Sequence, residues 1–136
     1  MNWYKQASEN KKISYSAVLI DEPSRSELLS KLKPYIPDGW KIIAHHMTIN
    51  MGPLKDATEA GKGVSLVADH WAKDDKAMAV MVSGYERKMP GTAHITIAIN
   101  AEMGAKPKDS NNLSGWQPIS NPITLNGTVT EVPFNS

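Results

Sequence analysis

The chain has no cysteine, no long apolar run and no marked excess of either charge. The absence of cysteine excludes disulfide bonds, thiolate nucleophiles and zinc–thiolate sites, and it is compatible with a reducing compartment. No segment approaches the roughly 20 apolar residues that a membrane-spanning helix needs, and residues 1–12 contain no run of signal-peptide length. We therefore expect a cytoplasmic protein that has no membrane partner.

The charge balance limits the kind of nucleic acid that the protein could hold. Fifteen Lys and Arg against fourteen Asp and Glu give a net charge of +1. This balance argues against binding to duplex DNA, which needs many phosphate contacts. A small anionic ligand needs only a local cluster of donors and is not excluded. The 136 residues, 40% of them apolar, predict one folded domain over residues 1–136.

The pattern of apolar residues predicts an α+β fold with a mostly antiparallel sheet. Residues 1–12 read as an N-terminal arm. One helix is expected over residues 24–33, because Ser24 and Glu27 have capping-box spacing and Leu28, Leu29 and Leu32 form an apolar stripe. Strands are expected at residues 15–20, 40–50, 64–72, 78–82, 93–99 and 123–132. A loop over residues 103–118 carries at most one helical turn, near residues 109–113.

Two of the predicted strands carry nearly the same tetrapeptide, H-M-T-I at residues 46–49 and H-I-T-I at residues 94–97. Because side chains alternate between the faces of a strand, His46 and Thr48 share one face, as do His94 and Thr96. The isoleucines and methionine of each tetrapeptide point the other way. Each strand is therefore expected to bury an apolar face and to present an imidazole and a hydroxyl on the opposite one.

Two imidazoles and two hydroxyls suit the hydrolysis of a phosphodiester. One histidine can deprotonate water and the other can protonate the departing oxygen, because the ordinary pKa of histidine is about 6.5. Threonine hydroxyls can hold the non-bridging oxygens. Such chemistry requires no metal and no cofactor. A single H-x-T-I sequence is usually an ordinary sheet face, so the pair carries the prediction, and an accidental pair in a structural domain stays an alternative.

The two H-x-T-hydrophobic motifs, about fifty residues apart on separate strands, resemble those of the 2H phosphoesterase superfamily. Its members include 2′,5′-RNA ligase-like proteins, cyclic phosphodiesterases, tRNA-ligase phosphodiesterase domains and phage enzymes that degrade cyclic nucleotide immune signals. The resemblance implies a bilobal, pseudo-symmetric α+β fold with a central cleft. It also implies that His46 and His94 are catalytic and that Thr48 and Thr96 bind phosphate. The second half has no long helix to mirror residues 24–33, which departs from the family pattern.

Three other residues are candidate ligand-binding residues. Tyr15 and Trp116 are candidates for stacking on a base, although aromatic residues more often belong to the core or its rim. Lys106 could meet a phosphate, with a solvated loop as the alternative. His45 is expected in the core, because strand alternation turns it away from His46, and the same geometry disfavours a metal site.

We therefore expect a phosphoric diester hydrolase that acts on a small nucleotide or an RNA end. His94 would activate the attacking water or 2′-hydroxyl and His46 would protonate the leaving oxygen, although the residues do not separate these roles. The substrate would be a cyclic oligonucleotide, as in phage counter-defence in the host cytoplasm, or a 2′,3′-cyclic phosphate, as in RNA repair. A protein of the same fold that sequesters a nucleotide without cleaving it also stays open.

Overall fold

Antiparallel strands dominate the structure, a computed structural model that describes residues 12–134. The strands are β1 (Ile13–Ile20), β2 (Lys41–Ile42), β3 (His46–Met51), β4 (Gly63–Lys73), β5 (Ala77–Ser83), β6 (His94–Ile99) and β7 (Gln117–Pro133). The helical segments are α2 (Glu22–Leu32) and the 3₁₀ turns η1 (Lys33–Tyr35), η2 (Ala57–Glu59), η3 (Ala101–Met103) and η4 (Pro107–Asn112). The expected arm, residues 1–12, lies outside the described residues except for its last residue.

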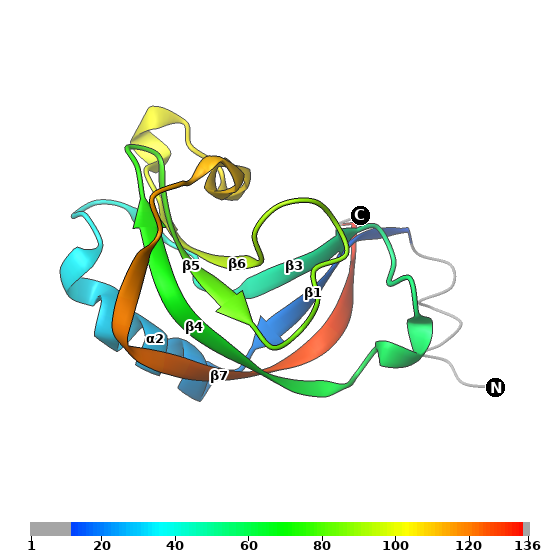
Figure 1. Ribbon diagram of the computed structural model, residues 1–136. Helices are drawn as coiled ribbons and strands as arrows, with labels where there is room; N and C mark the ends of the chain where they lie inside the picture. The colour runs from blue at the N-terminus through cyan, green and yellow to red at the C-terminus, as the bar shows by residue number, and fades with distance from the viewer. Residues whose placement is uncertain (1–11, 135–136) are drawn as a thin grey trace.

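Six of the strands close into a barrel (Figure 1). The order around it is β6-β3-β1-β7-β4-β5, and β5 pairs again with β6 to complete the ring. Every pairing is antiparallel. The short β2 pairs with β6 as well, on the side of β3. The α+β class with mostly antiparallel strands is confirmed, whereas the division into two lobes is not.

The main core fills the barrel, since all six strands contribute buried side chains to one apolar cluster. β3 contributes Met47 and Ile49, and β6 contributes Ile95 and Ile97. Each such side chain stabilises the fold by roughly 1.5–3 kcal/mol when fully buried. Helix α2 packs beside β7 and adds its own leucines to the same cluster. The alternating residues of β3 and β6 therefore face the outside of the barrel. Among the described residues, no helix is long and apolar enough to cross a membrane.

The predicted strand over residues 40–50 is interrupted, and this break shapes the surface described below. The N–H of Ala44 donates to the carbonyl of Thr96 at 2.9 Å, whereas Met47 pairs with Ile95. Between these two contacts one strand advances by three residues, from 44 to 47, while β6 moves by one residue, from 96 to 95. The two extra residues, 45 and 46, form a bulge. Ala44 takes a left-handed conformation with φ 45°, which turns the chain at this point. Strand alternation from β2 to β3 is lost here.

Helix α2 begins earlier than the capping box predicts. Its N-cap is Asp21, whose carboxylate accepts the N–H of Ser24 at 2.9 Å, and Pro23 lies in the first turn, where no N–H is needed. The hydroxyl of Ser24 is buried and accepts the N–H of Asn126 from β7 at 2.8 Å. The predicted capping role of Ser24 and Glu27 is therefore wrong, and Ser24 instead ties the helix to the barrel.

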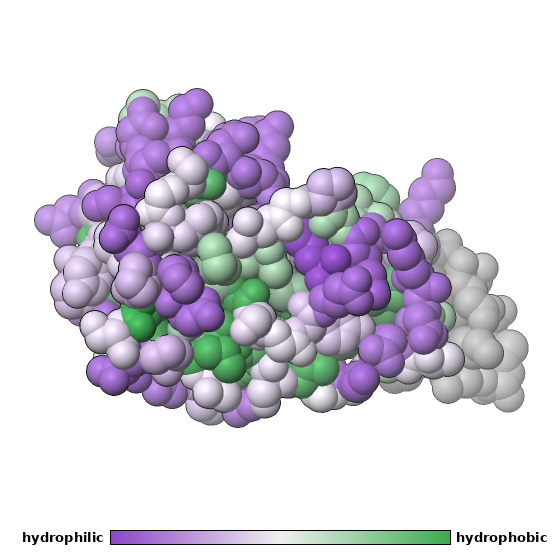
Figure 2. Space-filling view, in the orientation of Figure 1, coloured by the Kyte–Doolittle hydropathy of each residue, from purple (hydrophilic) through white to green (hydrophobic). Residues whose placement is uncertain are grey.

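The C-terminal third of the chain also differs from its expected boundaries. Strand β7 runs over 17 residues and pairs with both β1 and β4, so it begins six residues before the predicted residue 123. The expected helical turn is longer too, because η4 begins at Pro107. The segment with η3 and η4, drawn yellow to orange in Figure 1, projects above the barrel strands. Figure 2 shows that its outer surface is mostly hydrophilic.

The tie between helix and barrel predicts the effect of a substitution. Ser24→Ala leaves the N–H of Asn126 without its acceptor, and we expect the free energy of unfolding to fall by about 1–3 kcal/mol in urea denaturation. Glu27→Ala is the matched control, because Glu27 forms only an exposed ion pair with Lys31 at 3.5 Å and its loss costs about 0.5 kcal/mol or less. Equal losses in the two variants would contradict this account.

Candidate active site

Both tetrapeptide motifs open into one cavity of about 340 Å³ on the outside of the barrel. The strands β3 and β6 form its floor, and its walls come from β1, the segment that contains Ile43, the loop over residues 84–93 and the η4 segment. The structure thus brings together four of the predicted catalytic residues and one predicted binding residue, Tyr15. The lining residues are Tyr15, Ile43, His46, Thr48, Met51, Arg87, Met89, His94, Thr96, Pro107, Lys108 and Asn111.

The pairing of β3 with β6 sets how the motifs meet. Met47 pairs with Ile95, and these are the second residues of the two tetrapeptides. The two motifs therefore meet at this pair, and the first and third residues of each tetrapeptide line the same cavity.

His94 is held in one tautomer. Its side chain is only 8% exposed, and its Nδ1 lies 2.7 Å from the carbonyl oxygen of Thr92. A carbonyl can only accept, so Nδ1 carries the proton, and in the neutral ring Nε2 keeps its lone pair. Burial lowers the pKa of His94 and the nearby Arg87 lowers it further, against the opposing effect of the Thr92 hydrogen bond. His94 is therefore a neutral imidazole near pH 7, with Nε2 free to accept a proton.

His46 lies between two ring neighbours. Tyr15 stacks on it with ring centroids 5.0 Å apart and planes inclined by 30°. The Nδ1 of His45 lies 3.0 Å from the Nδ1 of His46. Burial lowers the pKa of His46 to about 4, with smaller contributions from the charges of His45 and His94. The coupling between His46 and His94 fits their position on one cavity.

The expectation that His45 packs in the core is wrong. Its side chain is exposed and lies beside His46, with the two rings nearly perpendicular at 88°. The reason is the two-residue bulge that follows Ala44, because side chains in a bulge do not alternate between faces as they do in a regular strand. A sequence argument based on period two could not detect this break.

The two threonines have different surroundings. Thr96 is buried, and its hydroxyl is placed to donate to the Oγ of Ser110 at 2.9 Å or to the carbonyl of Pro107 at 3.3 Å. It therefore fastens the η4 segment over the floor of the cavity. Within the described part of the chain, the hydroxyl of Thr48 has no hydrogen-bond partner. Thr48 is the hydroxyl that a ligand can use without breaking an existing contact.

Two of the predicted binding residues lie away from the cavity lining. Lys106 is exposed, and its backbone N–H donates to the carboxylate of Asp109 at 2.7 Å, at the start of η4. Trp116 packs against the small cluster of Leu113, Ala72 and Ala79. The aromatic residue that does line the cavity is Tyr15, and its cationic lining residues are Arg87 and Lys108.

No pattern in the sequence indicates most of the cavity wall. Arg87 comes from the loop over residues 84–93, where its Nε and Nη2 donate to the carbonyl of Pro90 and Nη2 also reaches Asn111 at 3.3 Å. These contacts hold the guanidinium at the cavity edge, where burial lowers its pKa from the ordinary value. Lys108, two residues beyond the predicted Lys106, is the lysine of this segment that lines the cavity.

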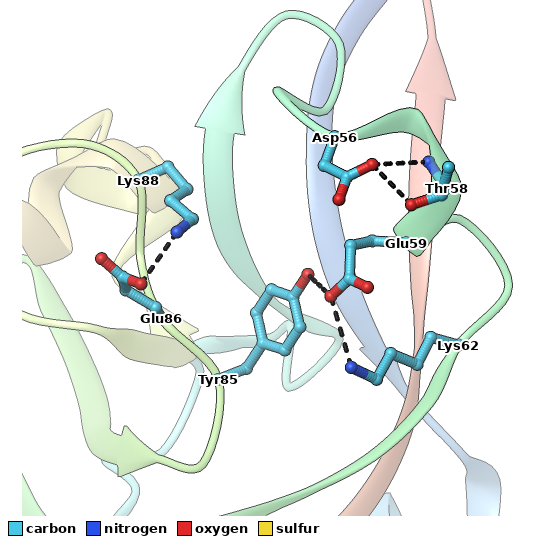
Figure 3. Close-up of polar contacts among 7 residues, drawn as sticks. All are labelled: Asp56, Thr58, Glu59, Lys62, Tyr85, Glu86 and Lys88. Carbon is cyan, nitrogen blue, oxygen red and sulfur yellow. Dashed lines mark hydrogen bonds and ion pairs between the residues drawn. The ribbon is translucent and has the colours of Figure 1, made fainter.

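A second cavity, of about 520 Å³, lies near Tyr85 and has a different character. Figure 3 shows that most of its polar side chains already bond to a neighbour. The hydroxyl of Tyr85 donates to Glu59 at 3.0 Å, and Lys88 pairs with Glu86 at 2.8 Å. No histidine lines it, although Ile49 of β3 does. We therefore assign the candidate chemistry to the smaller cavity, which contains both motifs.

Among residues 12–134, no group of three or more His, Asp or Glu side chains is arranged to hold a metal ion. The chain matches no known protein-family model and no curated protein sequence. What the site can do must therefore be inferred from its own residues.

The lowered pKa of His46 predicts how stability depends on pH. The unfolded chain takes up a proton on this histidine near pH 6.5, whereas the folded protein takes it up only near pH 4. The free energy of unfolding should therefore fall as the pH is lowered from 6.5 to 4, by on the order of 3 kcal/mol for this group. Urea denaturation across this range, with His46→Gln, measures the effect.

The variant should show a shallower pH dependence than the natural protein. Asn121→Gln is the control, because Asn121 is exposed, lies outside the cavity and does not titrate, so that substitution should leave the slope unchanged. If the free energy of unfolding depends on pH with the same slope in the natural protein and in His46→Gln, the lowered pKa of His46 is contradicted.

Proposed function

We propose that the protein is a metal-independent phosphodiesterase of the 2H type, which opens a nucleotide phosphodiester by acid–base catalysis with two histidines. The observation that carries the proposal is that both H-x-T motifs, from paired antiparallel strands, line one cavity. Two lobes related by pseudo-symmetry, as in that superfamily, belong to the same proposal. So does the absence of any cofactor.

His94 is the proposed base. Its Nδ1–H is bonded to the carbonyl of Thr92, so its Nε2 has a lone pair for the proton of the attacking water. His46 is the proposed acid, which protonates the oxygen that leaves phosphorus. Because an anion nearby favours the charged imidazolium, a bound phosphodiester raises the pKa of His46 above its value in the empty cavity. The environments of the two rings thus favour one assignment of the roles that the sequence left open.

The remaining polar groups of the cavity can hold the phosphate. The hydroxyl of Thr48 can donate to a non-bridging oxygen, as can the cations Arg87 and Lys108 at the rim. Arg87 is already oriented by Pro90 and Asn111, so it loses little freedom when it binds. Charge stabilisation comes from side chains, and the proposal therefore needs no divalent ion.

The apolar lining supports a nucleotide rather than a bare phosphate. Tyr15, Ile43, Met51 and Met89 line the cavity alongside the polar groups. A volume of about 340 Å³ lies at the lower end of the range of roughly 300–1,000 Å³ for small-molecule sites. This size supports one nucleotide unit at a time. We favour a small cyclic oligonucleotide as the substrate, with a 2′,3′-cyclic phosphate at an RNA end as the second candidate.

The function is tested by incubating the protein, in chelator, with 2′,3′-cyclic nucleotides and with 3′,5′-linked cyclic mono- and oligonucleotides. Chromatography should show one class opened, with a bell-shaped pH dependence of the rate. His46→Ala and His94→Ala should each lower turnover by about 10²–10⁴-fold. Binding without turnover by the natural protein would instead indicate a sequestering protein. Activity that appears only with added divalent metal would rule out the mechanism.

Substitutions of the two threonines should differ in their effects on turnover and on the free energy of unfolding. Thr48→Val removes a hydroxyl without a partner in the described structure, so we expect turnover to fall by about 10²-fold with little change in unfolding. Thr96→Val removes the bond to the buried Ser110, and it should also lower the free energy of unfolding by about 1–3 kcal/mol. Kinetics and urea denaturation of both variants give the comparison. Full activity in Thr48→Val would show that this hydroxyl does not touch the phosphate.

A further inference from the structure

The contact between His45 and His46 joins solvent to the cavity. Their Nδ1 atoms lie 3.0 Å apart, a distance at which one nitrogen must carry a proton and the other a lone pair. The ring of His45 is exposed, whereas His46 is mostly buried and lines the cavity. With Nδ1 of His46 occupied by this bond, Nε2 is the nitrogen left to face a ligand.

We propose that His45 is the solvent end of a two-imidazole proton relay, through which His46 is charged with the proton that it gives to the leaving oxygen. The proposal rests on the proposed phosphodiesterase function. His45 touches no substrate in this scheme, so it is a positioning and proton-supplying residue rather than a catalytic one.

The proton path balances at each step. A solvent proton binds Nε2 of His45, the Nδ1 proton of His45 passes to Nδ1 of His46, and the Nε2 proton of His46 passes to the leaving oxygen. As that phosphorus–oxygen bond breaks, the attacking water forms the new one and gives its proton to Nε2 of His94. Through cavity water, this proton then returns to Nε2 of His46. The Nδ1 proton passes back to His45, whose Nε2 releases its proton to solvent.

The composition of the cavity wall supports this role. An acid at a buried position needs a partner that stabilises its charged form, and carboxylates commonly serve. None of the described residues that line the cavity is Asp or Glu. The titratable or charged groups facing His46 there are Tyr15 from β1, His94 from β6, Arg87 from the loop and Lys108 from η4. His45, whose Nδ1 lies 3.0 Å from the Nδ1 of His46, is therefore the group placed to hand it a proton from solvent.

The backbone that places His45 is strained. Ala44, with φ 45°, lies in the left-handed region that residues with a Cβ rarely adopt, at a cost of roughly 1–2 kcal/mol. Arg25 holds this turn from helix α2, since its Nε donates to the carbonyl of Ala44 at 3.0 Å and its Nη2 to that of Ile43 at 3.4 Å. Backbone strain is commonly retained at functional sites, and here it accompanies a turn that brings two imidazoles together.

The relay is tested with His45→Ala on two substrates, namely the nucleotide that the natural protein opens and a 4-nitrophenyl phosphodiester. The nitrophenolate leaves without a proton, so only the nucleotide reaction needs the relay. We expect kcat on the nucleotide to fall at least about 10-fold, toward the lower part of the range for general acid–base catalysis, with little change on the nitrophenyl ester. Added imidazole should restore part of the loss, since the vacated position is exposed. His70→Ala is the matched control and should change neither rate.

The possible outcomes separate the relay from the function on which it rests. A natural protein that opens no nucleotide fails the proposed function, and the relay with it. An active natural protein with an unchanged His45→Ala variant overturns the relay alone. So does an equal loss on both substrates, which would indicate a structural role. Nitrogen NMR of the ligand-free protein gives a readout independent of turnover, in which loss of His45 should shift the Nδ1 resonance of His46 and leave that of His94 in place.

Discussion

The pairing of β3 with β6 is the constraint on which the rest of the molecule depends. It closes the barrel, since β6 joins β3 on one edge and β5 on the other. It also fixes the register at Met47 and Ile95, which sends two apolar residues of each strand into the core and the histidines and threonines outward. The same contacts therefore build the core and assemble the candidate site. A slip of one residue would reverse every side chain of a strand and destroy both at once.

Much of this arrangement could be predicted from the sequence, because it follows from short-range periodicity. The alternation in residues 46–49 and 94–97 correctly assigns which side chains share a face, and both motifs line one cavity. The features that could not be predicted from the sequence depend on long-range pairings or on irregular segments. The closure of the barrel depends on pairings between distant strands. Likewise, Arg87 and Lys108 reach the cavity from loops that have no periodic pattern.

The two errors of local prediction share a physical origin. Ser24 was assigned to a cap because hydroxyls commonly bond the first turn, but its acceptor capacity goes to Asn126 on β7. His45 was assigned to the core because strands alternate, but a left-handed residue before it breaks the alternation. In both places a tertiary contact overrides a local rule. In the second, the departure falls beside a candidate catalytic residue, where functional sites most often depart from such rules.

Because the cavity lies outside the barrel, the side chains that pack the core and those that line the cavity are mostly different residues. A barrel that holds its ligand inside has to trade interior packing against room for that ligand. Here the interior is filled by apolar side chains, and the cavity walls come from β1 and from segments that connect the strands. Loop substitutions can therefore change which ligands fit while the packed interior stays intact. Such a scaffold lets ligand preference diversify quickly under selection without first losing its fold.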